Sequence, residues 1–292
     1  MDGILIIDKP KHVTSRDVVN DVIKIFNTKK VGHTGTLDPL ATGVLVVCVG
    51  RATKLVDELT SSDKEYIASV TLGIQTDSLD IMGKELFSED AIKTKEEIIN
   101  ALNSFKGSYE QEVPIYSAVK KNGKKLYEYA REGIKIELPK RLVEIKEIEL
   151  IDDIEYKNNK TMFKFRCVVS KGTYIRSLIN DIATKLDTIG IMTNLRRTRQ
   201  GNYKIEDSIK VDDIIINSLK KITDILPYKK IELTEEIRKK VLNGALVDNI
   251  YNEEKILFTE NNEAIALYQE TDDKNKLKSY IMFKGGMIWH LL

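Results

Sequence analysis

A glycine-rich loop over residues 32–43 carries the carboxylate best placed for chemistry, Asp38. Pro39 follows it, and the proline ring pushes Asp38 out of the helical region into an extended conformation. Glycines in the loop allow the backbone to approach a ligand closely. The plain alternative is an Asp-Pro turn whose carboxylate satisfies local amides. The loop is long for such a turn and an apolar run, 44–49, follows at once, so we favour a functional carboxylate anchored by a buried strand.

Arg176 is the second residue whose position suggests chemistry. Thr173 is the expected N-cap of a helix, which places Arg176 at the third helical position. A cation there opposes the helix dipole, so its guanidinium is expected to face an anion, either a carboxylate or a phosphate. A surface arginine bent away from the helix is the alternative. Tyr66 is either a core residue or a platform on which a base stacks, and Lys9, beside Pro10, is typical of a solvated turn.

Several common kinds of site find no support in the sequence. The three histidines, His12, His33 and His290, are scattered, and neither Cys48 nor Cys167 has a partner at metal-ligand spacing. The glycine-rich loop lacks the Gly-Lys-Ser/Thr ending and the following helix of a phosphate-binding loop. No dinucleotide fingerprint and no serine elbow occurs. We therefore expect an enzyme that uses no metal ion and no cofactor.

The elements that must position these residues come in mixed order, without a regular βαβ repeat, which favours the α+β class. Thr14 with Ser15 caps one helix, and a capping box at Thr94 opens another. The segment 225–227 breaks the pattern, and a small, mostly β module of about 65 residues follows, with a helix near 234–242 and short strands up to Trp289. The other predicted elements are strands over residues 3–7, 44–49, 66–72, 142–150 and 162–169, and helices over 15–26, 95–105, 123–131 and 173–186.

Composition is that of an ordinary globular protein. Of 292 residues, 42% are hydrophobic and 31% are charged, with a net charge of +1, which excludes a disordered polyelectrolyte. The two cysteines lie in apolar runs and indicate buried thiols of a reducing compartment. The longest apolar stretch is far shorter than the ~20 residues that span a bilayer, and the chain starts without a basic leader. We expect roughly two domains in a soluble, cytoplasmic protein.

Charge is nevertheless segregated along the chain. Residues 116–141 carry eight basic and three acidic residues, and residues 164–204 carry nine basic and two acidic. The acidic excess lies over 76–112 and 205–274. Two basic stretches on one face would bind a polyanion. A solvated, lysine-rich face is the alternative, against which the concentration of arginine over residues 196–199 argues.

Eight motifs follow one another along the chain: Asp8-Lys-Pro10 with Thr14-Ser15, Gly32-His-Thr-Gly-Thr-Leu-Asp-Pro-Leu-Ala-Thr-Gly43, Lys64-Glu-Tyr66, Leu72-Gly-x-x-Thr-Asp-Ser-x-Asp80, Pro114-Ile-Tyr-Ser-Ala-Val-Lys120, Lys124-Lys-Leu-Tyr-Glu-Tyr-Ala-Arg131, Ser170-Lys-Gly-Thr-Tyr-Ile-Arg176 and Leu195-Arg-Arg197. Taken together, they resemble the motifs of the TruB-type tRNA pseudouridine synthases. They occur in the family's order and cover residues 4 to about 203, and the long motif that contains Asp38 is the most specific. One departure is His12, where the family pattern has glycine, and it puts the conformation of that turn in question.

The resemblance implies a pseudouridine synthase fold over residues 1–227, with a mixed, mainly antiparallel sheet, flanking helices and a basic insertion at about 120–141 that clamps the T arm of tRNA. It implies a PUA-like RNA-binding domain over residues 228–292. The implied enzyme isomerises uridine at position 55, in the T loop, to pseudouridine. It needs no cofactor, metal ion, membrane or protein partner, and it acts as a monomer on tRNA.

The resemblance also implies a role for each matching residue. In the reaction, Asp38 is the essential carboxylate, Arg176 pairs with it, Tyr66 stacks on the flipped uracil and serves as a base in the proton transfer, and Lys9 supports the floor of the site. In substrate binding, His33 fills the space vacated by the flipped base, Tyr174 and Leu195 line the pocket, and Asp80 helps to hold the nucleic acid or its loop.

Three alternatives remain open. A non-catalytic RNA-binding or RNA-folding protein would use the basic stretches but would not need Asp38. A nucleobase glycosylase or nucleoside hydrolase would share the carboxylate and release free uracil. Within the resemblance, a guide-dependent, dyskerin-like synthase would require guide RNA and partner proteins.

Overall fold

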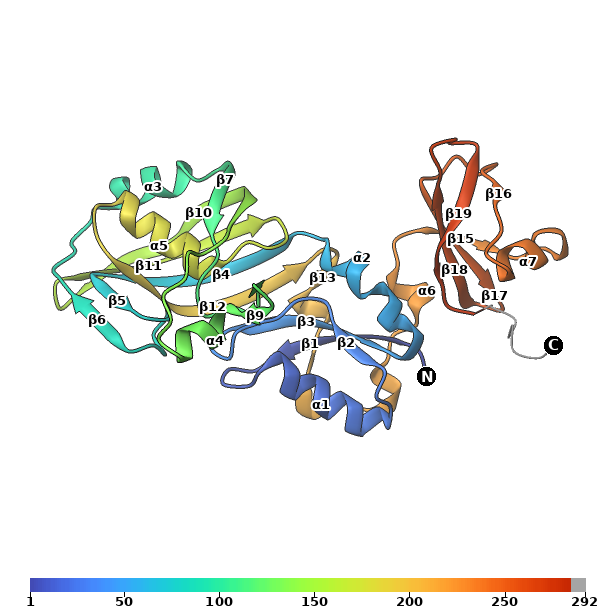
Figure 1. The fold of residues 1–292 in the computed structure, drawn as a ribbon, viewed down its shortest axis with the longest axis horizontal. Coiled ribbons are helices and arrows are strands. Elements are labelled where there is room, and N and C mark those ends of the chain that lie inside the picture. Colours follow the sequence, from blue (N-terminus) through green and yellow to red (C-terminus); the bar gives the residue numbers. More distant parts are fainter. Residues whose placement is uncertain (285–292) are drawn as a thin grey trace.

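Two sheets organise residues 1–284, the part of the chain that the computed structural model describes (Figure 1). Within that range, ten strands form a large sheet in which antiparallel neighbours predominate, and five strands form a small sheet toward the C-terminal end. Strands and helices follow one another in mixed order. The predicted α+β class, with a mainly antiparallel sheet and a small, mostly β module, is therefore confirmed.

The large sheet has the spatial order β14-β1-β3-β12-β4-β11-β10-β7, with β13 beside β12 and β2 beside β3. The pairing of β12 with β3 is parallel and joins the two halves of the sheet. The strand bounds are β1 (Gly3–Lys9), β2 (Val31–His33), β3 (Thr42–Val49), β4 (Lys64–Leu72), β7 (Gly107–Glu112), β10 (Lys140–Lys157), β11 (Lys160–Val169), β12 (Gly190–Gln200), β13 (Tyr203–Lys204) and β14 (Ile209–Lys210). A separate hairpin consists of β5 (Ile74–Thr76) and β6 (Glu85–Ser88).

Helices cover the large sheet in two places. Helices α3 and α5 pack on the half that contains β4, β10, β11 and β12, and α1 packs on the half that contains β1 and β3 (Figure 1). No helix within residues 1–284 is long and apolar enough to cross a membrane. The helices are α1 (Ser15–Phe26), α2 (Val56–Thr60), α3 (Lys95–Asn103), α4 (Leu126–Arg131), α5 (Ile175–Lys185), α6 (Ile222–Ile225) and α7 (Glu235–Leu242).

The predicted start of α1 is confirmed in detail. The Thr14 hydroxyl accepts a hydrogen bond from the Asp17 N–H at 3.0 Å, and the Asp17 carboxylate accepts one from the Thr14 N–H at 3.0 Å, which completes a capping box. His12, in the turn before it, has a φ of 67°, in the left-handed region that glycine adopts most easily. Its N–H donates to the Pro39 carbonyl at 2.7 Å. The turn therefore keeps a glycine-like conformation with histidine in place.

The insertion differs from the prediction of one helix over residues 123–131. Only α4 is helical, and the residues before it form a hairpin of β8 (Lys120–Lys121) and β9 (Lys124–Lys125). The connecting Asn122 and Gly123 have φ values of 54° and 81°. An Asn-Gly pair with two positive φ angles is the preferred two-residue turn of a tight hairpin, and this local signal outweighs helical propensity.

The small sheet has the order β15-β17-β18-β19-β16, and it contacts the large domain beside α2 (Figure 1). Glu58 of α2 accepts hydrogen bonds from Lys255 at 2.5 Å and Tyr280 at 3.0 Å, and from Tyr228. The predicted strand that ends at Trp289 lies outside the described residues, as does His290. The strands are β15 (Lys229–Glu232), β16 (Val247–Asp248), β17 (Lys255–Glu260), β18 (Glu263–Glu270) and β19 (Lys276–Met282).

Candidate active site

A cavity of about 420 Å³ lies where the Asp38 loop, the start of β4, the β11–α5 connection and the base of the insertion meet. Its volume is that of a pocket for one small-molecule-sized group. Five residues singled out in the sequence line it, and three others, Lys9, His33 and Asp80, lie outside its wall. The five lining residues are Asp38, Tyr66, Tyr174, Arg176 and Leu195.

Asp38 and Arg176 form an ion pair in the wall of this cavity. Arg176 Nε lies 2.9 Å from Asp38 Oδ2, and the two side chains are 6% and 36% exposed, respectively. The carboxylate therefore reaches the cavity while the guanidinium is enclosed. A charge-assisted hydrogen bond of this kind fixes the position of the carboxylate. The prediction that Arg176 faces an anion is met by Asp38.

Two further groups and a second carboxylate hold Arg176. Its terminal nitrogens donate to the Ser78 and Tyr116 carbonyl oxygens, each at 3.0 Å. Asp80 Oδ2 lies 3.9 Å from Arg176 Nε, and the other Asp80 oxygen accepts hydrogen bonds from the Ser78 hydroxyl and the Met82 N–H. Asp80 is thus buried beside the arginine and binds its own loop rather than facing the cavity.

Contacts from distant segments fix the Asp38 loop. The Ser15 hydroxyl accepts from the Leu37 N–H at 2.8 Å and lies 3.1 Å from the Leu37 carbonyl oxygen, to which it donates. The Ala41 N–H donates to the Asp38 carbonyl at 3.0 Å, which closes a turn around Pro39. Leu37 and Leu40 are buried in the core on either side. The backbone is therefore held in place on both sides of Asp38, as a preorganised site requires.

Arg197 links the two ends of the Asp38 loop by hydrogen bonds. It is 1% exposed, and it donates to the Gly35 carbonyl at 3.1 Å and to the Val44 carbonyl at 2.6 Å. Gly43 has a φ of +103°, and a Cβ atom there would lie 2.1 Å from the Arg197 carbonyl oxygen. Only glycine allows this approach of β3 to β12. Arg197 belongs to the basic stretch over residues 164–204, and here it is buried at the edge of the cavity, where its guanidinium holds the loop.

Gln111, which the sequence analysis missed, holds the start of α5. Its side-chain oxygen accepts from the Tyr174 N–H at 2.7 Å, and its amide nitrogen donates to the Tyr174 carbonyl at 3.1 Å. Helix α5 begins at Ile175 with Tyr174 as the N-cap, and the Thr173 hydroxyl donates instead to the Ser170 carbonyl. The predicted cap at Thr173 was therefore wrong because Gln111, distant in sequence, fixes the N-cap residue. Arg176 occupies the second helical position rather than the third.

Tyr66 and Leu195 reach the cavity from neighbouring strands. Tyr66 is 8% exposed on β4, and Leu195 is 6% exposed on β12. Both belong to the main hydrophobic core and also line the cavity, so each ring or methyl group presents one face to it. Side chains alternate along β4, and Lys64 therefore lies on the same face as Tyr66.

Lys9 and His33 are buried near the cavity. The Lys9 ammonium is 0% exposed and donates to the Pro10 and Val13 carbonyls at 2.8 and 2.7 Å. Burial lowers the pKa of Lys9 to about 8, although nearby Asp38 opposes that shift. Burial also lowers the pKa of His33, whose Nδ1 accepts from the Gly35 N–H at 3.3 Å. The solvated turn considered for Lys9 is thus excluded, and His33 is neutral near pH 7.

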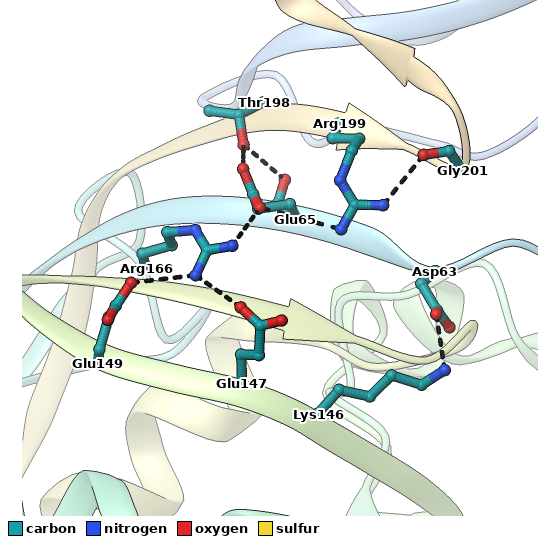
Figure 2. A network of polar contacts seen from close by, with 9 residues as sticks. All are labelled: Asp63, Glu65, Lys146, Glu147, Glu149, Arg166, Thr198, Arg199 and Gly201. Carbon is teal, nitrogen blue, oxygen red and sulfur yellow. Dashed lines mark hydrogen bonds and ion pairs between the residues drawn. The ribbon is translucent and has the colours of Figure 1, made fainter.

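Much of the positive charge predicted to meet phosphates is neutralised within the protein. Figure 2 shows Arg166 between Glu65, Glu147 and Glu149, at 2.6, 2.8 and 3.0 Å. Arg196 pairs with Asp8 in the same way, at 2.8 Å. Carboxylates that hold these guanidinium groups also offset the positive charge that an RNA phosphate would meet. In the insertion, Lys124, Lys125 and Arg131 lie over tyrosine rings at 5.0–5.4 Å, and Lys124 also pairs with Glu132.

The arrangement offers a carboxylate, held by a buried arginine, in the wall of a cavity that an aromatic ring also lines. Such a carboxylate can act as a nucleophile or stabilise a developing positive charge at a sugar carbon. A flat ring can stack on Tyr66. Among residues 1–284, no three His, Cys, Asp or Glu side chains gather as a candidate metal site.

Comparisons with known proteins agree with this geometry. The model of the TruB family pseudouridylate synthase N-terminal domain matches residues 23–175. A protein of Lactobacillus acidophilus named tRNA pseudouridine synthase B is 43% identical over 281 residues, 92% of this chain and 95% of that protein. The protein of the same name from Bacillus subtilis is 38% identical over 288 residues, 92% of this chain and 93% of its own.

Solved structures share the fold as well. A chain in the crystal structure of a Cbf5-Nop10-Gar1 complex has a TM-score of 0.69 and 27% identity, over 97% of this chain and 85% of that one. The pseudouridine synthase fold expected from the motifs is confirmed by this likeness, and the family expected from them by the sequence matches. The chain that places Asp38 against Arg176 is therefore an isomerase of the TruB family of pseudouridylate synthases.

Proposed function

We propose that the protein converts uridine to pseudouridine in the T loop of tRNA, at position 55. The observation that carries the proposal is the ion pair of Asp38 and Arg176, at 2.9 Å, in the wall of a cavity that Tyr66 also lines. The names of the curated relatives support tRNA as the substrate. Asp38 would be the essential carboxylate, and Arg176 would hold it in position.

The target base must leave its stack to enter the cavity, which costs a few kcal/mol. Stacking on the ring of Tyr66 returns about 1–3 kcal/mol. Tyr174 and Leu195 would close the cavity around the base. His33, which is neutral and adjoins the Asp38 loop, would fill the space that the base vacates. Contacts to the RNA backbone must supply the remaining free energy.

The reaction is an isomerisation, so its atoms balance without a co-reactant. The bond from uracil N1 to ribose C1′ breaks, the base turns, and C5 bonds to C1′. The proton on C5 leaves, and N1 gains one. Asp38 would act on C1′ while that carbon is electron-poor. Tyr66, on whose ring the base would stack, would accept the proton from C5 while its own hydroxyl proton passes on toward N1. Lys9 would support the floor of the active site. Asp80 would hold Arg176 and the loop over residues 76–84 in place.

The two parts of the chain would divide the binding of tRNA. We assign catalysis to residues 1–227, with an insertion at about 120–141 that grips the T arm through lysines and tyrosines. We assign auxiliary RNA contact to a PUA-like domain over residues 228–292. The enzyme would act alone, as a monomer, in the cytoplasm. Buried, unpaired Cys48 and Cys167 support a reducing compartment.

The test is to incubate the purified chain with an unmodified tRNA transcript and no other macromolecule. Pseudouridine-specific carbodiimide adducts, located by primer extension, should appear at position 55 of the T loop. Modification only after a guide RNA or partner proteins are added would support the guide-dependent alternative. Release of free uracil would support a glycosylase. Tight binding with no modification would support an RNA-binding protein.

A further inference from the structure

Lys64 is a buried cation that the reaction proposed above does not use. It is 7% exposed, it lines the cavity, and its ammonium group donates to the Thr60 and Ser62 carbonyls, each at 2.6 Å. An ammonium group has three N–H donors. Two are accounted for by the carbonyls, so one remains for a group in the cavity. A buried charge is expected to be paired.

The acidic neighbours of Lys64 do not pair with it. Asp63 binds Lys146 at 2.7 Å, and Glu65 binds Arg166 at 2.6 Å and the Thr198 hydroxyl at 2.7 Å (Figure 2). Glu65 lies on the opposite face of β4 because side chains alternate along a strand. Both carboxylates are therefore committed to other partners.

Two more cations share this corner of the cavity with Lys64. Lys171, which is exposed, and Arg197, which is 1% exposed, both line the cavity. Among residues 1–284, none of the three has a carboxylate within ion-pair distance. Arg197 and Lys171 also lower the pKa of Lys64, after the larger effect of burial. Asp63, which is paired with Lys146, opposes these effects on Lys64 only in part, so the corner keeps a positive field.

We propose that Lys64 and Lys171, with Arg197 behind them, bind one phosphodiester of the RNA, adjacent to the base that stacks on Tyr66. This phosphate site rests on the function proposed above and adds to it a contact for the RNA backbone. Lys64 and Tyr66 are two residues apart on one face of β4, a separation of about 7 Å. That distance suits the span from a base to a phosphate of the same nucleotide. The contact would hold the extruded nucleotide at both ends.

The experiment uses full-length protein that carries Asp38→Asn, so that the RNA stays unmodified. Lys64→Met and Lys171→Gln are compared with Lys157→Gln, which removes one exposed positive charge outside the cavity. Affinity is measured against a T-arm hairpin with normal linkages and against one with uncharged methylphosphonates on both sides of the target uridine, over a range of salt concentrations. Lys171 is exposed, so its variant reports on the site even if Lys64→Met fails to fold.

Each cavity variant is expected to bind the normal hairpin about tenfold more weakly, with a salt slope lower by about 0.7, as for one lost phosphate contact on a single strand. Neither should weaken binding to the methylphosphonate hairpin further. Equal weakening on both hairpins, or salt slopes no lower than that of Lys157→Gln, would overturn the site. Failure of the unsubstituted protein to modify tRNA would instead overturn the proposed function.

Discussion

Arg176 contacts Asp38 from within the protein while its two terminal nitrogens bind carbonyls of separate segments. Nε lies 2.9 Å from Asp38 Oδ2, and the other donors reach Ser78 and Tyr116 at 3.0 Å. One planar guanidinium thus joins the Asp38 loop, the hairpin connection and the base of the insertion. Lysine has the charge but not this fixed set of donors. The pair therefore links the position of the carboxylate to the integrity of three segments.

Replacing Arg176 should damage both stability and activity. Arg176→Met removes the cationic partner of Asp80, which is buried, and of Asp38, which is partly buried. The free energy of unfolding should fall by about 3–5 kcal/mol. The lower end of this range is expected because Asp38 is 36% exposed. Arg176→Lys should retain more of the stability but lose most of the activity. Urea unfolding and tritium release from RNA labelled at uracil C5 measure the two effects. Full activity of Arg176→Lys would contradict the role given to the guanidinium.

Gln111→Met should slow the reaction more than it weakens binding. The substitution removes both hydrogen bonds to the Tyr174 backbone, and Tyr174 precedes the helix that carries Arg176. A small displacement there can reduce the rate by about 10²-fold, with a stability loss of about 1–3 kcal/mol. Single-turnover rates and tRNA affinity separate the two effects.

The matched control for Gln111 is Thr161→Val. Thr161 is also fully buried and bonds the Ala91 carbonyl and the Lys93 N–H, away from the cavity. It should lose comparable stability and keep its single-turnover rate. If both variants slow the reaction equally, Gln111 has no positioning role beyond general stability.

Gly43→Ala should destabilise the protein more than Gly107→Ala does, although both glycines have a φ of +103°. An added Cβ at Gly43 meets the Arg197 carbonyl at 2.1 Å, whereas at Gly107 nothing lies within 4 Å. The difference isolates the steric clash from backbone strain and is expected to be about 1–3 kcal/mol. Thermal unfolding measures it, and tritium release should fall only for Gly43→Ala. Equal melting temperatures of the two variants would show that β3 and β12 can move apart with no loss of stability.

Lys9 should give stability a distinctive dependence on pH. Its pKa is about 8 in the folded protein and 10.5 when solvated, so between these values the unfolded chain binds more protons. Stability from this group therefore increases as pH rises from 8 to 10.5, by about 3 kcal/mol in all. The measurement is the unfolding free energy of the unsubstituted protein minus that of Lys9→Met. The titration of tyrosines and other lysines contributes equally to both proteins, so this difference should rise between pH 8 and pH 10.5. A flat difference would show that Lys9 keeps an ordinary pKa.

Local signals in the sequence predicted much of the fold and the centre of the site. The Thr14 cap, the buried strand after the Asp38 loop and the meeting of Asp38 with Arg176 all follow from short-range rules or motif order. Gln111 and the burial of Arg197 could not be predicted, because both depend on which distant strands become neighbours. The Asn-Gly turn of the insertion is a local signal that the sequence does contain, but the prediction of a helix over residues 123–131 gave it too little weight.

The role of Asp38 is tested most directly by tritium release from tRNA labelled at uracil C5, measured for the unsubstituted protein and for Asp38→Asn. Isomerisation must expel that hydrogen, and the proposed reaction requires the Asp38 carboxylate. We expect release by the unsubstituted protein and none by the variant, which keeps its fold and its affinity for tRNA. Equal release by both would contradict the central claim that the carboxylate held by Arg176 carries the reaction.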